Sequence, residues 1–291
     1  MKSAITDQKS PIRDLGYKPY DGPRLSHRGR FQVLFRRNLA LAWASTLVKV
    51  DLILSMFPMV VCAVIMYLKL AAQKRGLPIK EDPGLWVFNC IFWCQIWFAF
   101  TMSLLVAAPT ISADVRSGAF QFYFARPVSR MAYLLGKVLS AAVLIASILA
   151  IPGLLLAIMR VALAADGGDA LTQLPLLLKT ILYSVLFTAT LILPAFALGA
   201  LSRQPGYVQG GWAALFFLPW LLGEGIAAAT EIPYIALISL PTNLRWIGEA
   251  LFGVPSSHDL AWYWPTGALL LIVGCATWWV IRRLDRVEVF S

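Results

Sequence analysis

Two long stretches of this chain, Trp86–Thr110 and Val138–Met159, contain no Asp, Glu, Lys or Arg. A helix that crosses the hydrocarbon layer needs about 20 apolar residues, and uncharged runs of this length are typical of membrane spans. The whole chain of 291 residues fits this pattern, because 59% are hydrophobic and 14% charged, and the mean hydropathy is +0.72. A soluble domain carries about 25% charged residues. The sequence therefore predicts an all-α polytopic membrane protein.

The hydropathy pattern predicts about six spans. Their approximate ranges are 51–68, 86–110, 138–159, 180–201, 209–226 and 260–281. The fifth is the weakest, because Pro219 and three glycines (Gly210, Gly211 and Gly223) interrupt it. The segment Ile232–Leu240 is also apolar but too short to cross, so we expect an interfacial or re-entrant piece there.

The distribution of Lys and Arg predicts the orientation, because cytoplasmic loops of membrane proteins are enriched in both. With a cytoplasmic N-terminus, 18 of the 25 Lys and Arg residues fall inside. The remaining seven fall outside: Lys69, Lys74, Arg75, Lys80, Arg160, Lys179 and Arg245. Both termini are therefore expected in the cytoplasm. The net charge of +10 reflects this topology and contact with lipid headgroups, and no nucleic-acid-binding module is recognisable.

We expect the chain to divide into a cytosolic segment, 1–26, and a transmembrane domain, 27–291. The transmembrane domain begins with a helix over 27–48. In this helix an apolar face alternates with arginines, which predicts that it lies in the headgroup plane. The apolar face comprises Phe31, Leu34, Phe35, Leu39, Ala42 and Trp43, while Arg30, Arg36 and Arg37 face anionic lipid. The alternative is that this helix extends the first span. No cleavable signal peptide is visible.

The residue patterns of common catalytic and metal sites are missing from the sequence. Gly136–Lys137 continues into Val138, so it is not a phosphate-binding loop, and no serine nucleophile elbow occurs. His27 and His258 lie in no metal-ligand spacing. Four cysteines occur in apolar runs, and Cys90 and Cys94, one helical turn apart, are more readily core residues than a metal pair. We therefore expect a non-enzymatic chain with no catalytic, cofactor-binding or metal residues.

Charges inside spans are costly and often functional, at about 2.5–3.5 kcal/mol each at mid-membrane. Only Asp51, near one end of span one, and Glu224, near the outer end of span five, are candidates. We expect interfacial solvation or a local ion pair for both, with substrate gating as the alternative. Because no carboxylate relay lies at mid-depth, a secondary transporter or channel is disfavoured. An intramembrane enzyme is disfavoured by the missing carboxylate pairs and metal ligands.

The loop between the two uncharged runs is rich in aromatic and cationic residues, and reads DVRSGAFQFYFARPVSR from Asp114 to Arg130. With its flanks, Ile111–Lys137, it resembles the permease subunits of type-2 ATP-binding-cassette (ABC) exporters. The resemblance rests on Asp114, Gly118, the aromatic run 120–124, the Pro-Val-Ser-Arg element 127–130 and Gly136–Lys137. It extends more weakly over the whole chain, including SLPTNLRWIGEALFG before the last span. Ala119 stands where the family often has Thr, and Val115 and Arg116 stand where further acidic residues are common, so the charge of the contact differs.

The resemblance implies that this loop is a cytosolic coupling helix that docks on a separate ATPase subunit. The implied contact residues are Asp114, Arg116, Gly118, Phe120, Tyr123, Phe124, Arg126, Pro127 and Arg130. The physical pattern agrees, since clustered aromatics are a liability in water but good anchors in a partner's groove. Pro127 is expected to end the short helix. The alternative is that the aromatics line the headgroup region.

We therefore expect the chain to be the permease subunit of an ATP-driven exporter and a multi-pass protein of a bacterial cytoplasmic membrane. Its expected partners are an ABC ATPase subunit, a second copy of itself or a related permease, and membrane lipid. ATP and Mg²⁺ would bind in the ATPase, with no cofactor in this chain. The alternatives are a secondary transporter or channel, or a membrane component of an assembly or maturation system. The apolar, Trp-rich spans suit a lipid-like or hydrophobic cargo and equally a plain lipid-facing surface.

Overall fold

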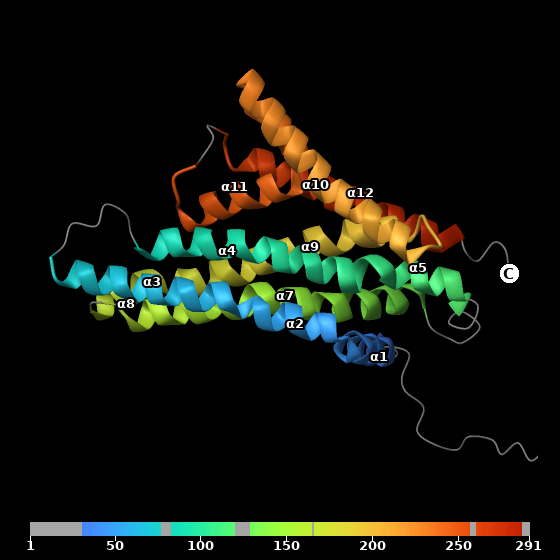
Figure 1. The fold of residues 1–291 in the computed structure, drawn as a ribbon, viewed down its shortest axis with the longest axis horizontal. Coiled ribbons are helices and arrows are strands. Elements are labelled where there is room, and N and C mark those ends of the chain that lie inside the picture. The colour runs from blue at the N-terminus through green and yellow to red at the C-terminus, as the bar shows by residue number, and fades with distance from the viewer. Residues whose placement is uncertain (1–30, 77–82, 120–128, 165, 257–259, 287–291) are drawn as a thin grey trace, which may run out of the picture.

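The computed structural model describes residues 31–76, 83–119, 129–164, 166–256 and 260–286, and in these ranges the regular structure is helical. Six helical segments are long and apolar enough to cross a membrane: Thr46–Lys74, Trp86–Ser117, Arg130–Ala162, Gly167–Gly199, Pro205–Thr230 and Tyr263–Arg283. Most of these segments run side by side in an elongated bundle (Figure 1). The prediction of an all-α polytopic membrane protein is thus confirmed.

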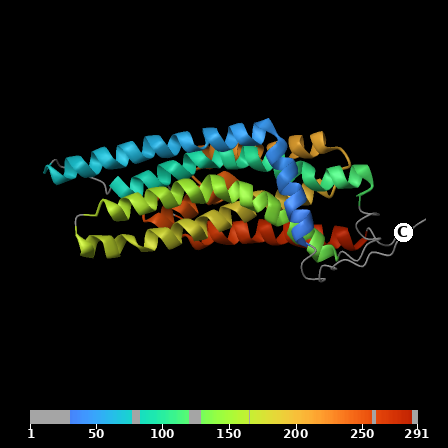
Figure 2. The ribbon, with the colours of Figure 1, turned by 90° about the horizontal axis from the view of Figure 1, so that it is seen from below.

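The first span is preceded by a helix that crosses the end of the bundle. Helix α1 (Phe31–Ala44) runs nearly perpendicular to the long helices (Figure 2). Ser45 has an extended backbone (φ −73°, ψ 127°), which turns the chain into α2 (Thr46–Leu54). The span then continues after Ser55 as α3 (Met56–Lys74). The end of the bundle crossed by α1 is called the α1 end below.

Spans two to four form the centre of the bundle. The second span consists of α4 (Pro83–Met102), a π-helical turn η3 (Ser103–Ala107) and α5 (Ala108–Ser117). The third is α7 (Arg130–Ala162), and the fourth combines α8 (Gly167–Gln173) with α9 (Pro175–Gly199). In an 18-residue apolar stretch of each central span, 44–56% is buried, against 17–22% in the other three spans. The outer spans therefore present most of their surface to the surroundings.

The chain after span four differs from the sequence-based expectation. Helix α10 (Pro205–Thr230) runs unbroken through Pro219 and the glycines and leans away from the bundle axis (Figure 1). Since hydrocarbon offers no water to freed backbone groups, a helix is the favoured state despite the proline. A short 3₁₀ turn, η4 (Pro233–Ile238), follows, and helix α11 (Leu240–Phe252) packs against α4, α9, α10 and α12 before the last span, α12 (Tyr263–Arg286).

Candidate functional site

The residues on either side of the aromatic loop show how α5 ends before the loop and how α7 begins after it. Helix α5 stops at Gly118, which adopts a left-handed backbone (φ 66°) and donates its N–H to carbonyls of the last turn. Glycine takes this conformation without strain. On the far side, the Ser129 hydroxyl accepts the Ala132 N–H (3.2 Å) and caps α7. Gly118 and Ser129 thus fix where the loop leaves and re-enters the bundle.

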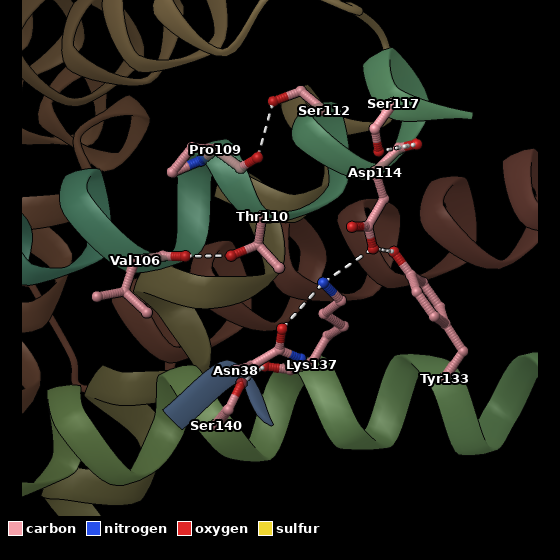
Figure 3. A network of polar contacts seen from close by, with 10 residues as sticks. All are labelled: Asn38, Val106, Pro109, Thr110, Ser112, Asp114, Ser117, Tyr133, Lys137 and Ser140. Atoms are coloured by element: carbon pink, nitrogen blue, oxygen red, sulfur yellow. Dashed lines mark hydrogen bonds and ion pairs between the residues drawn. The ribbon is translucent and has the colours of Figure 1, made fainter. Parts of the chain in front are cut away.

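A polar junction ties three elements together next to this loop. The Lys137 Nζ of α7 lies 2.8 Å from the Asp114 Oδ2 of α5, and the same carboxylate oxygen accepts the Tyr133 hydroxyl at 2.7 Å. Lys137 also donates to the Asn38 Oδ1 of α1 at 3.2 Å. Figure 3 shows the four side chains converging between α5, α7 and α1. We call these residues, Asn38, Asp114, Tyr133 and Lys137, the polar junction.

Burial makes the polar junction intolerant of the loss of one partner. The side chain of Lys137 is 4% exposed and that of Asp114 13%. The attraction between the two charges offsets part of their desolvation, whereas removal of one partner leaves an isolated buried charge, at a cost of about 3–5 kcal/mol. Lys137 therefore holds the end of span two, the start of span three and α1 in one arrangement.

Gly136, the neighbour of Lys137, lets α1 approach α7 closely. A Cβ atom on Gly136 would lie 2.8 Å from the Leu34 Cβ and 2.9 Å from the Phe31 carbonyl oxygen, both in α1. Backbone and Cβ atoms move little, so a side chain here would push α1 away. Gly136 and Lys137 together provide the space and the polar anchor for α1.

The apolar face of α1 packs on α7, a partner that the sequence analysis did not predict. Leu34 is buried, and Phe31, Phe35, Leu39 and Ala42 are partly covered as α1 lies on α7. Arg36 and Arg37 are exposed, as expected, and Trp43 is 53% exposed. The remaining surface of α1 is exposed.

The structure divides the predicted contact residues into three groups. Arg116 is exposed, and Gly118 and Arg130 are partly buried. Asp114 is turned toward α7 by Lys137 and Tyr133, so its carboxylate positions the loop rather than facing outward. Phe120, Tyr123, Phe124, Arg126 and Pro127 lie outside the described residues. Reasoning from sequence missed Asn38 and Tyr133, although Lys137 stood in the motif that pointed to this region.

Comparison with known proteins adds no assignment to this geometry. No protein-family model matches the chain, and no curated protein matches it.

A second polar cluster lies in the half of the bundle away from α1, where α11 begins. The Ser239 hydroxyl caps α11 by accepting the Thr242 N–H (3.2 Å), and the Thr242 hydroxyl donates to the Glu224 Oε1 of α10 at 2.7 Å. Further along α11, Arg245 Nε donates to the buried Glu249 at 2.9 Å. Glu224 thus joins α10 to the N-terminus of α11, where a carboxylate is favourable.

Asp51 departs from its predicted interfacial environment. Its side chain is only 7% exposed, whereas interfacial solvation requires access to water. A residue two positions away, Lys49, is exposed and makes no ion pair with it among the described contacts. Asp51 is therefore a buried acidic residue within the first span.

Proposed function

We propose that this chain is the permease subunit of an ATP-driven exporter of the type-2 ABC class. The observation that carries the proposal is the polar junction, because it connects the ends of the predicted coupling loop to two spans and to α1. A displacement of the loop would be transmitted to these elements together, since the Lys137–Asp114 pair resists separation.

In this proposal the loop 120–128 is the part that docks on the ATPase. Phe120, Tyr123 and Phe124 serve as packing anchors, and Arg116, Arg126 and Arg130 as charged contacts near the rim. In the proposal Asp114 does not contact the ATPase directly but positions the loop through its ion pair with Lys137. Closure of two ATPases around ATP and Mg²⁺ would move two docked loops together, and the spans would open a path outward.

The remaining parts of the proposal follow from the same assignment. The chain itself hydrolyses no ATP, pairs with a second copy or a related permease, and resides in a bacterial cytoplasmic membrane with both termini in the cytoplasm. The excess of Lys and Arg in the segments assigned to the inside supports this orientation.

Co-purification with its ATPase, followed by transport-coupled ATP hydrolysis in vesicles, tests the proposal. Truncation of a well-packed interface aromatic costs about 2 kcal/mol or more, which is about thirty-fold in affinity. Phe124→Ala and Tyr123→Ala should therefore lose ATPase recovery and transport while still inserting into the membrane. Arg126→Ala should be milder and most visible at low salt, because rim charges act mainly on association.

Two outcomes would contradict the proposal. Normal transport by both aromatic variants would mean that this loop is not the docking element. ATP turnover by a preparation proven free of other subunits would remove the permease assignment altogether. Leu171→Ala is the matched control, since this exposed apolar residue lies in α8, at the end of the bundle opposite α1 (Figure 1).

A further inference from the structure

One backbone carbonyl in span two receives no hydrogen bond from its own helix. In the π-helical turn η3 the Ala108 N–H bonds the Ser103 carbonyl, five residues back, whereas in a regular α-helix it would bond the Leu104 carbonyl. In the π-helical pattern the donor to Leu104 would be the N–H of residue 109, but this residue is Pro109, which has none. Neither bonding pattern within this described helix therefore reaches the Leu104 carbonyl.

A side chain of span five supplies the missing donor. Gln209 of α10 is partly buried, and its Nε2 donates to the Leu104 carbonyl oxygen at 3.0 Å. A carbonyl without a partner is costly inside a membrane, because no water is present to replace the lost bond. Gln209 thus takes the place of the N–H that Pro109 lacks, and the backbone bonding of span two depends on a neighbouring span.

Helix α5, which follows the π-turn, is a short segment held near both ends by other spans. It has 10 residues and packs against α9 and α10. Toward its far end Asp114 pairs with Lys137 of α7 at 2.8 Å, and Figure 3 shows Pro109 and Asp114 on this one helix. Just before its near end lies the Leu104 carbonyl that Gln209 bonds. Helix α5 therefore connects the predicted coupling loop to the interrupted part of span two.

The interruption makes the connection between α4 and α5 the part of span two that bends most readily. Sharp bends in helices occur at prolines and at π-helical turns, and here Pro109 closely follows the π-turn. Each backbone bond that is missing removes resistance to a change in the angle between the two helices. The bond from Gln209 restores one of them for as long as α10 stays in place.

We propose that the π-turn of span two is a hinge between α4 and α5, and that Gln209 of α10 is the latch that holds it. With the latch bond formed, α4 and α5 keep the angle seen in this structure. A shift of α10 breaks the bond and frees α5 to change its angle, together with the loop that follows it. The inference goes beyond the proposed permease function, because it concerns this chain alone and needs no ATPase or transported substrate.

The test follows the hinge in the purified full chain in lipid nanodiscs, without an ATPase. Spin labels introduced as noncanonical amino acids at Thr101 in α4 and Arg116 in α5, both exposed, report the distance across the π-turn by double electron–electron resonance. A second pair at Leu135 and Ile151, exposed positions in the α-helix α7, reports a span with regular helix between the labels. We expect a broader distribution of distances across the π-turn than along α7.

Removal of the latch should make this difference larger. Gln209→Met takes away the donor but keeps the length of the side chain, so the distance distribution across the π-turn should widen while that along α7 stays unchanged. Amide exchange in 104–113 should accelerate about tenfold, because the hinge opens more often. Gln204→Met is the matched control, since this exposed glutamine at the start of α10 makes no side-chain hydrogen bond among the described residues.

A second variant tests why the latch is needed. Pro109→Ala provides a backbone N–H at the interrupted turn, so the distance distribution across the π-turn should narrow. In this background Gln209→Met should have little effect on distance or exchange, because the helix then supplies its own donor. A role of Gln209 in packing alone predicts the same effect in both backgrounds.

Two results would overturn the proposal. One is a distribution across the π-turn that is as narrow as that along α7 and that Gln209→Met leaves unchanged, a result that does not depend on the folding of Pro109→Ala. The other is an equal effect of Gln209→Met with and without the Pro109→Ala change. Neither result bears on whether the loop docks on an ATPase, so the permease proposal is tested separately.

Discussion

Trp212 of α10 donates its indole N–H to the hydroxyl oxygen of Ser103 in the π-helical turn, 2.9 Å away, and both side chains are fully buried. The Ser103 hydroxyl in turn donates a hydrogen bond to the Phe100 carbonyl at 2.7 Å. One turn earlier in α10, Gln209 donates to the Leu104 carbonyl at 3.0 Å. A π-helical turn disturbs the regular ladder of backbone bonds, and α10 supplies donors where this happens. The π-turn is thus one place where span five is anchored to span two by hydrogen bonds.

This anchor predicts a measurable coupling between Trp212 and Ser103. Trp212→Phe keeps an aromatic ring but loses the donor, and Ser103→Ala loses the acceptor. We expect each variant to lower the free energy of unfolding by about 1–3 kcal/mol, because a buried polar group is left unpaired. Denaturant titration in mixed micelles measures the double-mutant cycle, with an expected coupling of about 1 kcal/mol. Fully additive effects would show that the bond contributes nothing to stability.

The contact between Gly136 and α1 predicts that Gly136→Ala detaches α1. The new Cβ would meet Leu34 Cβ and Phe31 O at under 3 Å, so α1 has to move. Hydrogen exchange of the α1 amides should accelerate at least about tenfold, which corresponds to a loss of about 1.4 kcal/mol in local stability. Gly274→Ala is the control, since its Cβ meets nothing within 4 Å, and a helical Gly→Ala change there should be neutral or stabilising. Unchanged exchange in Gly136→Ala would contradict the close packing.

The polar junction predicts that two single variants are worse than their combination. Lys137→Met and Asp114→Asn each leave a charge unpaired or poorly paired, at a cost of up to about 3–5 kcal/mol in the free energy of unfolding. The double variant removes both charges, so it should recover part of that loss. Tyr133→Phe, which removes one hydrogen bond, should cost only about 1–2 kcal/mol. Equal or greater destabilisation by the double variant would show that the pair is not the element that holds the junction.

The Glu224–Thr242 bond predicts that Thr242→Val loosens α11 from α10. A hydrogen bond to a charged group contributes about 1.5–3 kcal/mol, and valine matches threonine in shape while lacking the hydroxyl. Amide exchange in η4 and the first turn of α11 should rise, whereas Thr242→Ser should stay close to the wild type. If Thr242→Val leaves exchange in both elements unchanged, the hydroxyl does not tie the two helices.

The charge distribution predicts opposite sides for the C-terminus and the connection after span one. Reporter fusions at Ser291 and near Lys74 should report the inside and the outside respectively, because 18 of the 25 Lys and Arg residues fall on the side assigned to the cytoplasm. A report of the same side from both fusions would exclude a six-span topology with this orientation.

The parts of the fold that sequence reasoning found are those set by composition. Long uncharged runs have to be helices in hydrocarbon, so the six spans were predictable, and the periodicity of α1 correctly separated its apolar face from Arg36 and Arg37. The sequence did not predict that this face packs on α7, because the close approach of α1 at Gly136 depends on how the two helices cross. Helix α11 was missed because its thirteen residues include Asn243, Arg245 and Glu249. In the fold Asn243 donates to the Leu237 carbonyl, and Arg245 pairs with Glu249.

The candidate site was also predictable only in part. The loop could be singled out from the sequence because arginines and phenylalanines between two uncharged runs are unusual, and Asp114 is the acidic residue beside it. That Asp114 would be bound by Lys137, twenty-three positions further along, follows only once α5 and α7 lie side by side. Asp51 is likewise buried in α2, which packs against α4, and sequence spacing does not bring these two helices together.

The burial of α11 also bears on the order in which the helices enter the membrane. Thirteen residues are too few to partition into a bilayer as an independent segment, so α11 is passed over during synthesis while α10 on one side and α12 on the other are inserted. Its surfaces are completed by α4 and α9, which leave the ribosome earlier, and by α12, which leaves last. We therefore expect α11 to enter the bundle after its flanking spans are inserted, so a chain released after Phe252 would hold five spans in the membrane with α11 still outside them.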